Sequence, residues 1–206
     1  MSNQSSPTYR WYVVGILTLS YLVSFLDRQI LALMVGPIKA DLQLSDTEIS
    51  LIMGVAFSLF YAFMGIPLGW LADRTNRRNI IIVGMIFWSL MTAACGLASK
   101  FIHLFLARIG VGAGEASLTP SAISIISDYF SRQDRGRAIA TYNMGVSLGT
   151  GIAMVLGGVV ISFVADSPYI ELPIIGTLST WQYIFFVVSI PGLLVAIVIF
   201  FTISEP

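Results

Sequence analysis

Six long apolar segments alternate with short polar segments along this chain. Each apolar segment has about 20 residues or more, enough for an α-helix to cross the roughly 30 Å hydrocarbon core of a bilayer. Because the segments are continuously apolar rather than alternating, they predict membrane helices and not the strands of a membrane barrel. The helices are expected at residues 11–35, 49–70, 79–98, 102–126, 138–164 and 181–203.

The first apolar segment is too long for the core of a signal peptide and lacks a small-residue cleavage site, so we interpret it as a retained span. We expect residues 1–10 to form a cytoplasmic tail, residues 11–203 a six-span bundle, and residues 204–206 the start of a cytoplasmic linker. A capping signal at Ser45 and Glu48 predicts the start of the second helix.

Positive charges lie mostly on one side of this predicted bundle. Lys and Arg in short loops stay on the cytoplasmic side. Both termini are therefore expected in the cytoplasm, in a multi-pass protein of the plasma or inner membrane. The inner side would hold Arg10, Arg74, Arg77, Arg78, Arg132, Arg135 and Arg137, and the outer side Lys39 and Lys100.

Composition agrees with this class and excludes others. Of 206 residues, 56% are hydrophobic and 11% are charged, whereas a soluble domain has about 25% charged residues. The net charge of zero gives no general attraction to nucleic acid. The single cysteine, Cys95, and the single histidine, His103, predict neither a disulfide within the chain nor a metal site or cofactor. An intramembrane enzyme is disfavoured, because no Ser/His/Asp set or metal-ligand set is present.

Four charged residues fall inside the predicted spans: Asp27 and Arg28 in the first, Arg108 and Glu115 in the fourth. Such groups cost several kcal/mol unless they are paired or hydrated, so they are functional candidates. At 1.5 Å per residue, Asp27 and Arg108 lie roughly 12 and 9 Å below the outer ends of their helices and can share a layer. Glu115 lies two turns beyond Arg108 on the same face.

The first and fourth spans correspond if the chain consists of two three-helix units of opposite orientation. This inverted-repeat arrangement is common in secondary transporters, whose sites lie between the repeats. The predicted fold is therefore an all-α transmembrane bundle of six helices. Three Gly-x-x-x-Gly pairs predict close helix contacts, at Gly65 and Gly69, Gly110 and Gly114, and Gly145 and Gly149.

The loop between the second and third spans reads Gly-Trp-Leu-Ala-Asp-Arg-Thr-Asn-Arg-Arg from Gly69 to Arg78. It resembles the signature of the major facilitator superfamily, Gly-x-Leu-Ala-Asp-Arg-x-Gly-Arg-Arg/Lys. Asn76 replaces the usual glycine, and because Asn tolerates a left-handed backbone we expect it to preserve the turn. The loop after the fourth span resembles a repeat of this signature, with Arg132, Arg135 and Arg137.

Two further stretches resemble the spinster-like branch of that superfamily: Ser24-Phe-Leu-Asp27-Arg28 and the run from Arg108 to Glu115. Members of the branch are proposed to move lipids such as sphingoid molecules or lysophospholipids with proton coupling, and related branches carry organic anions and sugars. The resemblance implies a twelve-helix fold with a central cavity, of which this chain forms the N-terminal six-helix half. It also implies that Asp27 and Glu115 are protonation or substrate groups and that Arg28 and Arg108 are their partners.

The implied activity is secondary active transport of a small organic or lipid-like solute by alternating access, coupled to protons. A changing Asp27–Arg108 distance would load and unload the proton, although a static buried ion pair is the alternative. The second six-helix half would come from the same chain or from another one. Two other functions stay open: a symporter of organic anions or sugar acids, and a non-transporting six-helix half that dimerises with or regulates another membrane protein.

The Gly69–Arg78 loop is expected to act as a gate. The Asp73 carboxylate would interact favourably with the N-terminus of a helix in the second half. It would also bond the arginines of the cytoplasmic loops, which are Arg74, Arg77, Arg78, Arg132, Arg135 and Arg137. The alternative is a solvated turn whose arginines set topology alone. Finally, Phe57, Tyr61, Tyr142 and Asn143 are candidates to line a substrate cavity, with ordinary packing as the alternative.

Overall fold

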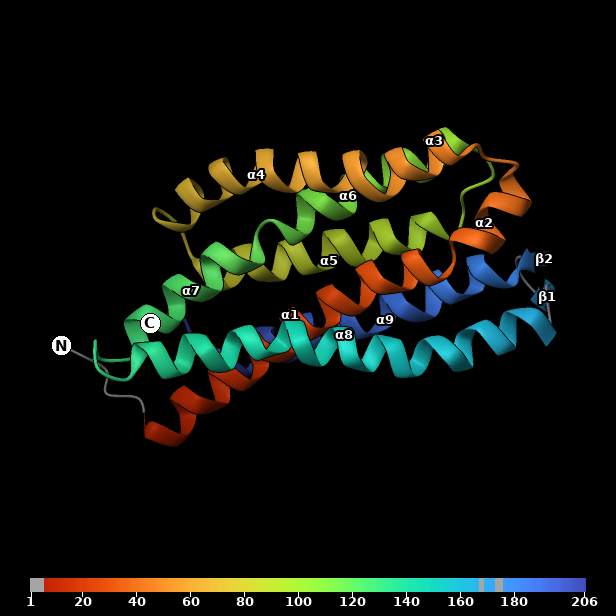
Figure 1. The fold of residues 1–206 in the computed structure, drawn as a ribbon. Coiled ribbons are helices and arrows are strands. Elements are labelled where there is room, and N and C mark those ends of the chain that lie inside the picture. The colour runs from red at the N-terminus through yellow and green to blue at the C-terminus, as the bar shows by residue number, and fades with distance from the viewer. Residues whose placement is uncertain (1–5, 167–168, 173–175) are drawn as a thin grey trace.

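The computed structural model describes residues 6–166, 169–172 and 176–206, and within them six helices are long and apolar enough to cross a membrane (Figure 1). The predicted six-helix, all-α fold is confirmed. The helices are α1 (Pro7–Leu33), α2 (Val35–Leu42), α3 (Asp46–Ser50), the π-helical turn η1 (Leu51–Val55), α4 (Ala56–Ala72), α5 (Arg77–Cys95), α6 (Phe101–Glu115), α7 (Leu118–Tyr129), α8 (Arg135–Asp166) and α9 (Thr180–Thr202).

Two local signals explain where the first helices begin. The side chain of Ser6 accepts a hydrogen bond from the backbone of Tyr9, and Pro7 occupies the first turn, so α1 begins four residues before the predicted residue 11. The predicted capping box is confirmed, because Glu48 N donates to Ser45 Oγ at 3.3 Å and Ser45 N donates to Glu48 Oε2 at 2.9 Å.

The fourth span, predicted over residues 102–126, is present as Phe101–Tyr129, but it is broken into two helices, which was not predicted. α6 ends at Glu115 and α7 begins at Leu118, with Ser117 Oγ donating to the carbonyl oxygen of Gly114 at 2.8 Å. Pro120 has no N–H to bond the carbonyl of Ala116, so the helix cannot continue without a gap in its hydrogen bonds. Glu115 is thereby placed at the end of a helix rather than in its middle.

A short hairpin replaces the predicted polar loop before the last span. Strands β1 (Tyr169–Leu172) and β2 (Gly176–Ser179) pair antiparallel, with Ile170 opposite Leu178. The hairpin leads directly into α9, whose first turn is capped by Ser179 and Gln182.

Small residues determine how closely the helices approach. A Cβ atom at Gly145 or Gly149 of α8 would lie 2.7 Å from a backbone carbonyl oxygen of α1. On α6, a Cβ atom would lie 2.5 Å from a side-chain atom of α5 at Gly110 and 2.8 Å from one at Gly114. These two predicted contacts are confirmed. The third pair is different, because a Cβ atom at Gly65 would meet nothing within 4 Å.

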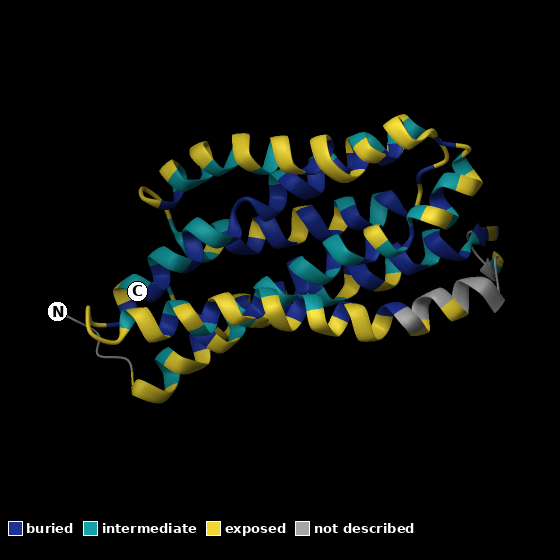
Figure 2. Ribbon diagram, in the orientation of Figure 1, coloured by how far each residue is buried: buried dark blue, intermediate teal, exposed yellow. Residues whose placement is uncertain are grey.

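Burial follows the position of each helix (Figure 2). The fourth span is the most enclosed of the six, whereas α4 and α8 expose much of their apolar surface. The start of α1 and the end of α9 lie at one end of the bundle (Figure 1), where the Tyr9 hydroxyl accepts a hydrogen bond from Ser204 N at 2.8 Å. The charged residues Asp27, Arg108 and Glu115 of the first and fourth spans are buried between the helices.

Candidate functional site

Three polar residues of α1 face the interior of the bundle. Ser24 and Asp27 are 1% and 2% exposed, and Arg28 is partly buried. Ser24 and Arg28 are four residues apart, so they lie on one face of the helix, and Arg28 Nη2 donates to Ser24 Oγ at 3.3 Å.

This face of α1 meets Glu115 at the end of α6. Arg28 donates to Glu115 Oε2 from Nε at 2.8 Å and from Nη2 at 2.5 Å, and Ser24 Oγ donates to the same oxygen at 2.6 Å. The other carboxylate oxygen, Oε1, is buried and has no hydrogen-bond partner. One oxygen of Glu115 is thus saturated, and the other is open to a proton or a ligand.

Aromatic rings surround the guanidinium group of Arg28. Its central carbon lies 4.7 Å from the ring centre of Phe25, 4.6 Å from that of Phe57 and 5.0 Å from that of Tyr61. Ring faces attract cations, so this arrangement holds Arg28 in place from sides that the carboxylate does not occupy. Phe57 and Tyr61 of α4, two of the predicted cavity residues, are therefore close to the charged cluster.

Asp27 has a different partner from the one expected. Thr92 Oγ1 on α5 donates to Asp27 Oδ2 at 2.7 Å, and the buried Oδ1 atom has no partner. In the part of the chain that the structure describes, no ion pair joins Asp27 to Arg108, so the expected pairing is not present in this conformation. Thr92 was not singled out from the sequence, because one threonine in an apolar span carries no signal of its own.

Arg108 on α6 is a buried cation with no carboxylate partner among the residues that the structure describes. It is 2% exposed, and its Nε atom has no hydrogen-bond partner. Its guanidinium carbon lies 5.1 Å from the ring centre of Phe57. Arg28 and Arg108 therefore contact the same ring, but only Arg28 is paired with an acid among the described residues.

The remaining cavity candidates, on α8, differ from each other. Tyr142 is fully buried and stacks on Tyr21, with ring centres 4.7 Å apart and planes 5° apart. Its hydroxyl lies 3.3 Å from Thr119 Oγ1. Asn143, the next residue, is exposed. Tyr142 thus joins α8 to α1 and α7, whereas Asn143 lies outside this packing.

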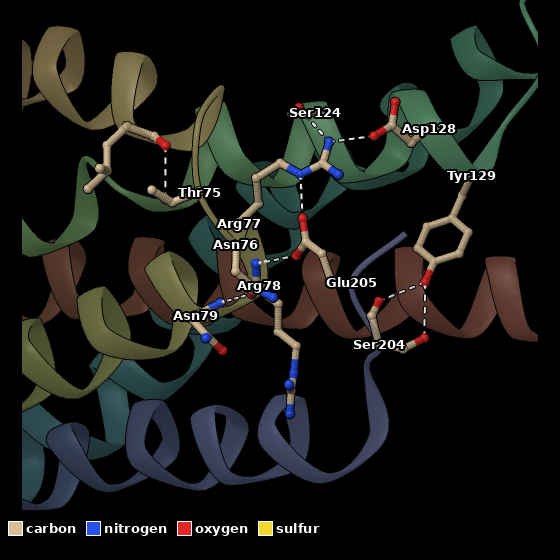
Figure 3. Close-up of polar contacts among 11 residues, drawn as sticks. Thr75, Asn76, Arg77, Arg78, Asn79, Ser124, Asp128, Tyr129, Ser204 and Glu205 are labelled. Carbon is tan, nitrogen blue, oxygen red and sulfur yellow. Dashed lines mark hydrogen bonds and ion pairs between the residues drawn. The ribbon is translucent and has the colours of Figure 1, made fainter.

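The loop between α4 and α5 forms a second polar cluster at the end of the bundle where the termini lie (Figure 3). Arg77 donates to Glu205 Oε1 at 2.6 Å, to Asp128 Oδ2 at 2.5 Å and to Ser124 Oγ at 3.0 Å. The backbone N–H of Arg78 donates to Glu205 Oε2 at 2.9 Å. Glu205 and Asp128 were missed by sequence analysis, because neither belongs to the recognised signature.

The other residues of the predicted gate are more dispersed. The Asp73 side chain is exposed and bonds none of the arginines that the structure describes. Arg74 stacks on Trp70, 4.1 Å from its ring centre, and Arg135 donates to the carbonyl of Ser127 at 2.7 Å. Arg132 and Arg137, on the loop before α8 and its first turn, are exposed. Within this chain, then, Glu205 and Asp128 take the arginine-binding role expected of Asp73.

Asn76 also behaves differently from expectation. The turn between α4 and α5 is preserved, but the φ angle of Asn76 is −69°, so its backbone is not left-handed. Instead it is the N-cap of α5, with its side-chain oxygen accepting from Asn79 N at 2.9 Å. The side chain caps the helix in a way that a glycine at this position could not.

The six-helix bundle, the charged interior and the arginine-rich loop agree with a match to a family model. Residues 17–206 match the model described as Major Facilitator Superfamily. The chain belongs to the major facilitator superfamily. Proteins of this superfamily are membrane transporters and not enzymes.

Among curated relatives in the superfamily, the probable L-galactonate transporter of Escherichia coli strain K12 is 36% identical over 67% of this chain and 30% of its own length. Protein spinster homolog 1 of Xenopus tropicalis is 32% identical over 97% of this chain and 36% of its own length. A solved bacterial homolog of the human lysosomal transporter spinster, inward-facing and unoccupied, is 40% identical with a TM-score of 0.87 and covers 98% of this chain. The chain spans 44% of that structure, and thus less than half of each of these proteins.

Proposed function

We propose that this chain forms the N-terminal half of a proton-coupled secondary transporter for an organic anion. The main support for this proposal is a set of polar atoms in the interior that have no hydrogen-bond partner. Asp27 Oδ1, Glu115 Oε1 and Arg108 Nε are all buried without a hydrogen-bond partner in the described structure. Buried polar groups are nearly always satisfied, so three open positions in one cluster fit a site completed by a proton and a substrate.

Arg108 supports the anionic substrate. A buried cation without a counterion is costly, and a carboxylate or phosphate group of a substrate would remove that cost. The guanidinium group also offers a planar, bidentate geometry for such groups. Phe57 lies against both Arg108 and Arg28 and supplies an apolar surface for the rest of the substrate.

The two carboxylates support the proton. Glu115 is held by Arg28, whereas Asp27 has only a neutral hydrogen-bond donor, Thr92. Burial favours the neutral form of a carboxyl group and a nearby cation favours the ionised form. A substrate anion on Arg108 would offset the positive charge of that arginine, so the ionised form of the buried Asp27 carboxyl group would be favoured less, and substrate and proton would bind together.

Alternating access requires a second bundle to close the cavity. We place the termini and the arginine-rich loops on the cytoplasmic side, following the distribution of positive charge, and we propose that a second six-helix half packs against this one. Asp73, whose exposed side chain bonds none of the described residues, is the candidate to contact that half. A non-transporting role for the six helices is the alternative.

Uptake into proteoliposomes containing the full-length protein tests this function. A sugar acid such as galactonate and a lysophospholipid would be offered separately, each with and without an inward proton gradient. We expect gradient-stimulated uptake of at least one anion, and we expect Asp27→Asn to abolish the stimulation while expression is retained. Thr92→Ser, which keeps the hydroxyl donor, is the matched control.

The two substrates distinguish the two kinds of relatives. The chain resembles both a galactonate transporter and a spinster homolog, so both substrates are tested. The charged cluster alone could bind the carboxylate of a sugar acid or the phosphate of a lysophospholipid. If the uptake rate is unaffected by the proton gradient and by Asp27→Asn, the proposal of proton coupling is wrong. An absence of uptake for every anion offered, by a folded protein, would favour the non-transporting role.

A further inference from the structure

A groove runs between α4 and α5 on the outer surface of the bundle, with a volume of about 520 Å³. Both helices pack on α6, and the groove lies between them, with α6 and the start of α7 as its floor. None of the four charged residues of the interior lines it. It is therefore separate from the proposed transport site, and its volume is typical of small-ligand sites.

The groove is apolar along its length and polar at one end. Its walls include Met64 and Leu68 on α4 and Val83 and Phe87 on α5. Val83 is 66% exposed and Phe87 is 43% exposed, so the groove opens to the surface of this six-helix unit. An unbranched apolar chain is the occupant that this depth of the membrane supplies.

The polar end of the groove coincides with the α4–α5 loop, beyond the end of the apolar span. Thr75, Asn76 and Asn79 line this end. Thr75 bonds the carbonyl of Leu71 and Asn76 caps α5. A ligand in this groove would thus have its apolar part along the helices and its polar group at the interface, which is the arrangement of a phospholipid.

The charge of the loop selects the type of phospholipid. Arg77 pairs with Glu205 and Asp128, and the guanidinium group of Arg78 donates to the carbonyl oxygen of Phe200 and lies 5.3 Å from the centre of that ring. Arg74, next to Thr75, is exposed and contacts only the ring and the carbonyl of Trp70 among the described residues. Of the three arginines of this loop, Arg74 is the exposed one, so it is available to a phosphate group, and anionic lipids attract such interfacial cations.

We propose that an anionic phospholipid of the leaflet facing the arginine-rich loops binds this groove, with one acyl chain between α4 and α5 and its phosphate group near Arg74. The lipid covers an apolar groove that the chain leaves open. Because its phosphate group contacts the α4–α5 loop, the lipid composition of the membrane would decide what this loop binds.

Native mass spectrometry of the full-length protein in detergent tests this site, with phosphatidylglycerol and phosphatidylcholine of the same acyl chains as probes. Val83→Trp fills the groove, and Leu194→Trp, at a 56% exposed position of α9, is its matched control. We expect Val83→Trp to lower phosphatidylglycerol binding about tenfold and Leu194→Trp to leave it unchanged. Equal binding by both variants and the unsubstituted protein would overturn the proposal.

The headgroup requires its own comparison. Arg74→Gln should bring phosphatidylglycerol binding down to the level of phosphatidylcholine, whereas Arg137→Gln, at another exposed arginine, should preserve the preference. Equal affinity for the two lipids in the unsubstituted protein would contradict the role of Arg74. A photocrosslinker at Val83 distinguishes the remaining occupant: crosslinks to lipid support the site, and crosslinks to another part of the protein overturn it.

Discussion

Arg28 on α1 and Glu115 on α6 meet at a single carboxylate oxygen. Two nitrogen atoms of Arg28 donate to Glu115 Oε2, at 2.8 and 2.5 Å, and Ser24 adds a third hydrogen bond at 2.6 Å. Because the other oxygen of Glu115 has no partner, the pair is held on one side and open on the other. The first and fourth spans are thus joined by a contact that still has a free acceptor.

Ser24→Ala should destabilise this contact measurably. Hydrogen bonds to charged groups contribute about 1.5–3 kcal/mol, and the serine donates to a buried carboxylate. Ser20→Ala is the matched control, because Ser20 is also buried on α1 but donates to the carbonyl of Ile16 in its own helix. Chemical unfolding in detergent micelles gives the comparison. An equal loss of stability in the two variants would show that the Ser24–Glu115 bond has no special weight.

Gly149→Ala and Gly65→Ala should change stability in opposite directions. A methyl group at Gly149 would lie 2.7 Å from the carbonyl oxygen of Leu22, and such overpacking costs about 1–3 kcal/mol. At Gly65 a methyl group meets nothing within 4 Å, and the gain in helix propensity is about 1 kcal/mol. The thermal midpoints of the purified variants measure both effects. A lower midpoint for Gly65→Ala would indicate that a partner outside the described chain occupies that face.

The sequence predicted the six spans because membrane helices have a strong signal: about 20 apolar residues without charge. It predicted the buried positions of Asp27, Arg108 and Glu115 for the same reason, since charges inside such runs are rare. It did not predict the break after Glu115, because a proline such as Pro120 can bend a membrane helix without ending it, and the pattern of apolar residues does not show which of the two occurs.

Partners within the charged cluster were harder to predict. Helix spacing places residues on a face but does not fix which side chains meet across two helices. The spacing alone therefore did not show that Arg28, and not Arg108, pairs with Glu115, or that Thr92 donates a hydrogen bond to Asp27. Similarly, Glu205 lies 128 residues from Arg77 along the chain, and no local pattern connects them.

The Arg77–Glu205 contact should show energetic coupling. In a double-mutant cycle of Arg77→Gln and Glu205→Gln, we expect a coupling of about 1 kcal/mol, at the upper end for pairs near a surface, because both groups are mostly buried. Chemical unfolding at low salt measures it, and the value should fall at high salt. The cycle of Arg74→Gln with Glu205→Gln is the control, for which we expect no coupling, since Arg74 contacts Trp70 instead.

Arg28→Lys and Arg108→Lys should separate structural from substrate-binding roles. Lysine keeps the charge but loses the planar fork. At Arg28 it loses the two bonds to Glu115, so the thermal midpoint should fall. At Arg108 no carboxylate contact is lost within the described chain, so the midpoint should change little, while the affinity for the transported anion falls by about tenfold or more. Thermal unfolding and uptake kinetics, measured on the same preparations, give both quantities. If Arg108→Lys lowers the midpoint as much as Arg28→Lys and leaves the affinity intact, Arg108 is a structural cation and the anion is bound elsewhere.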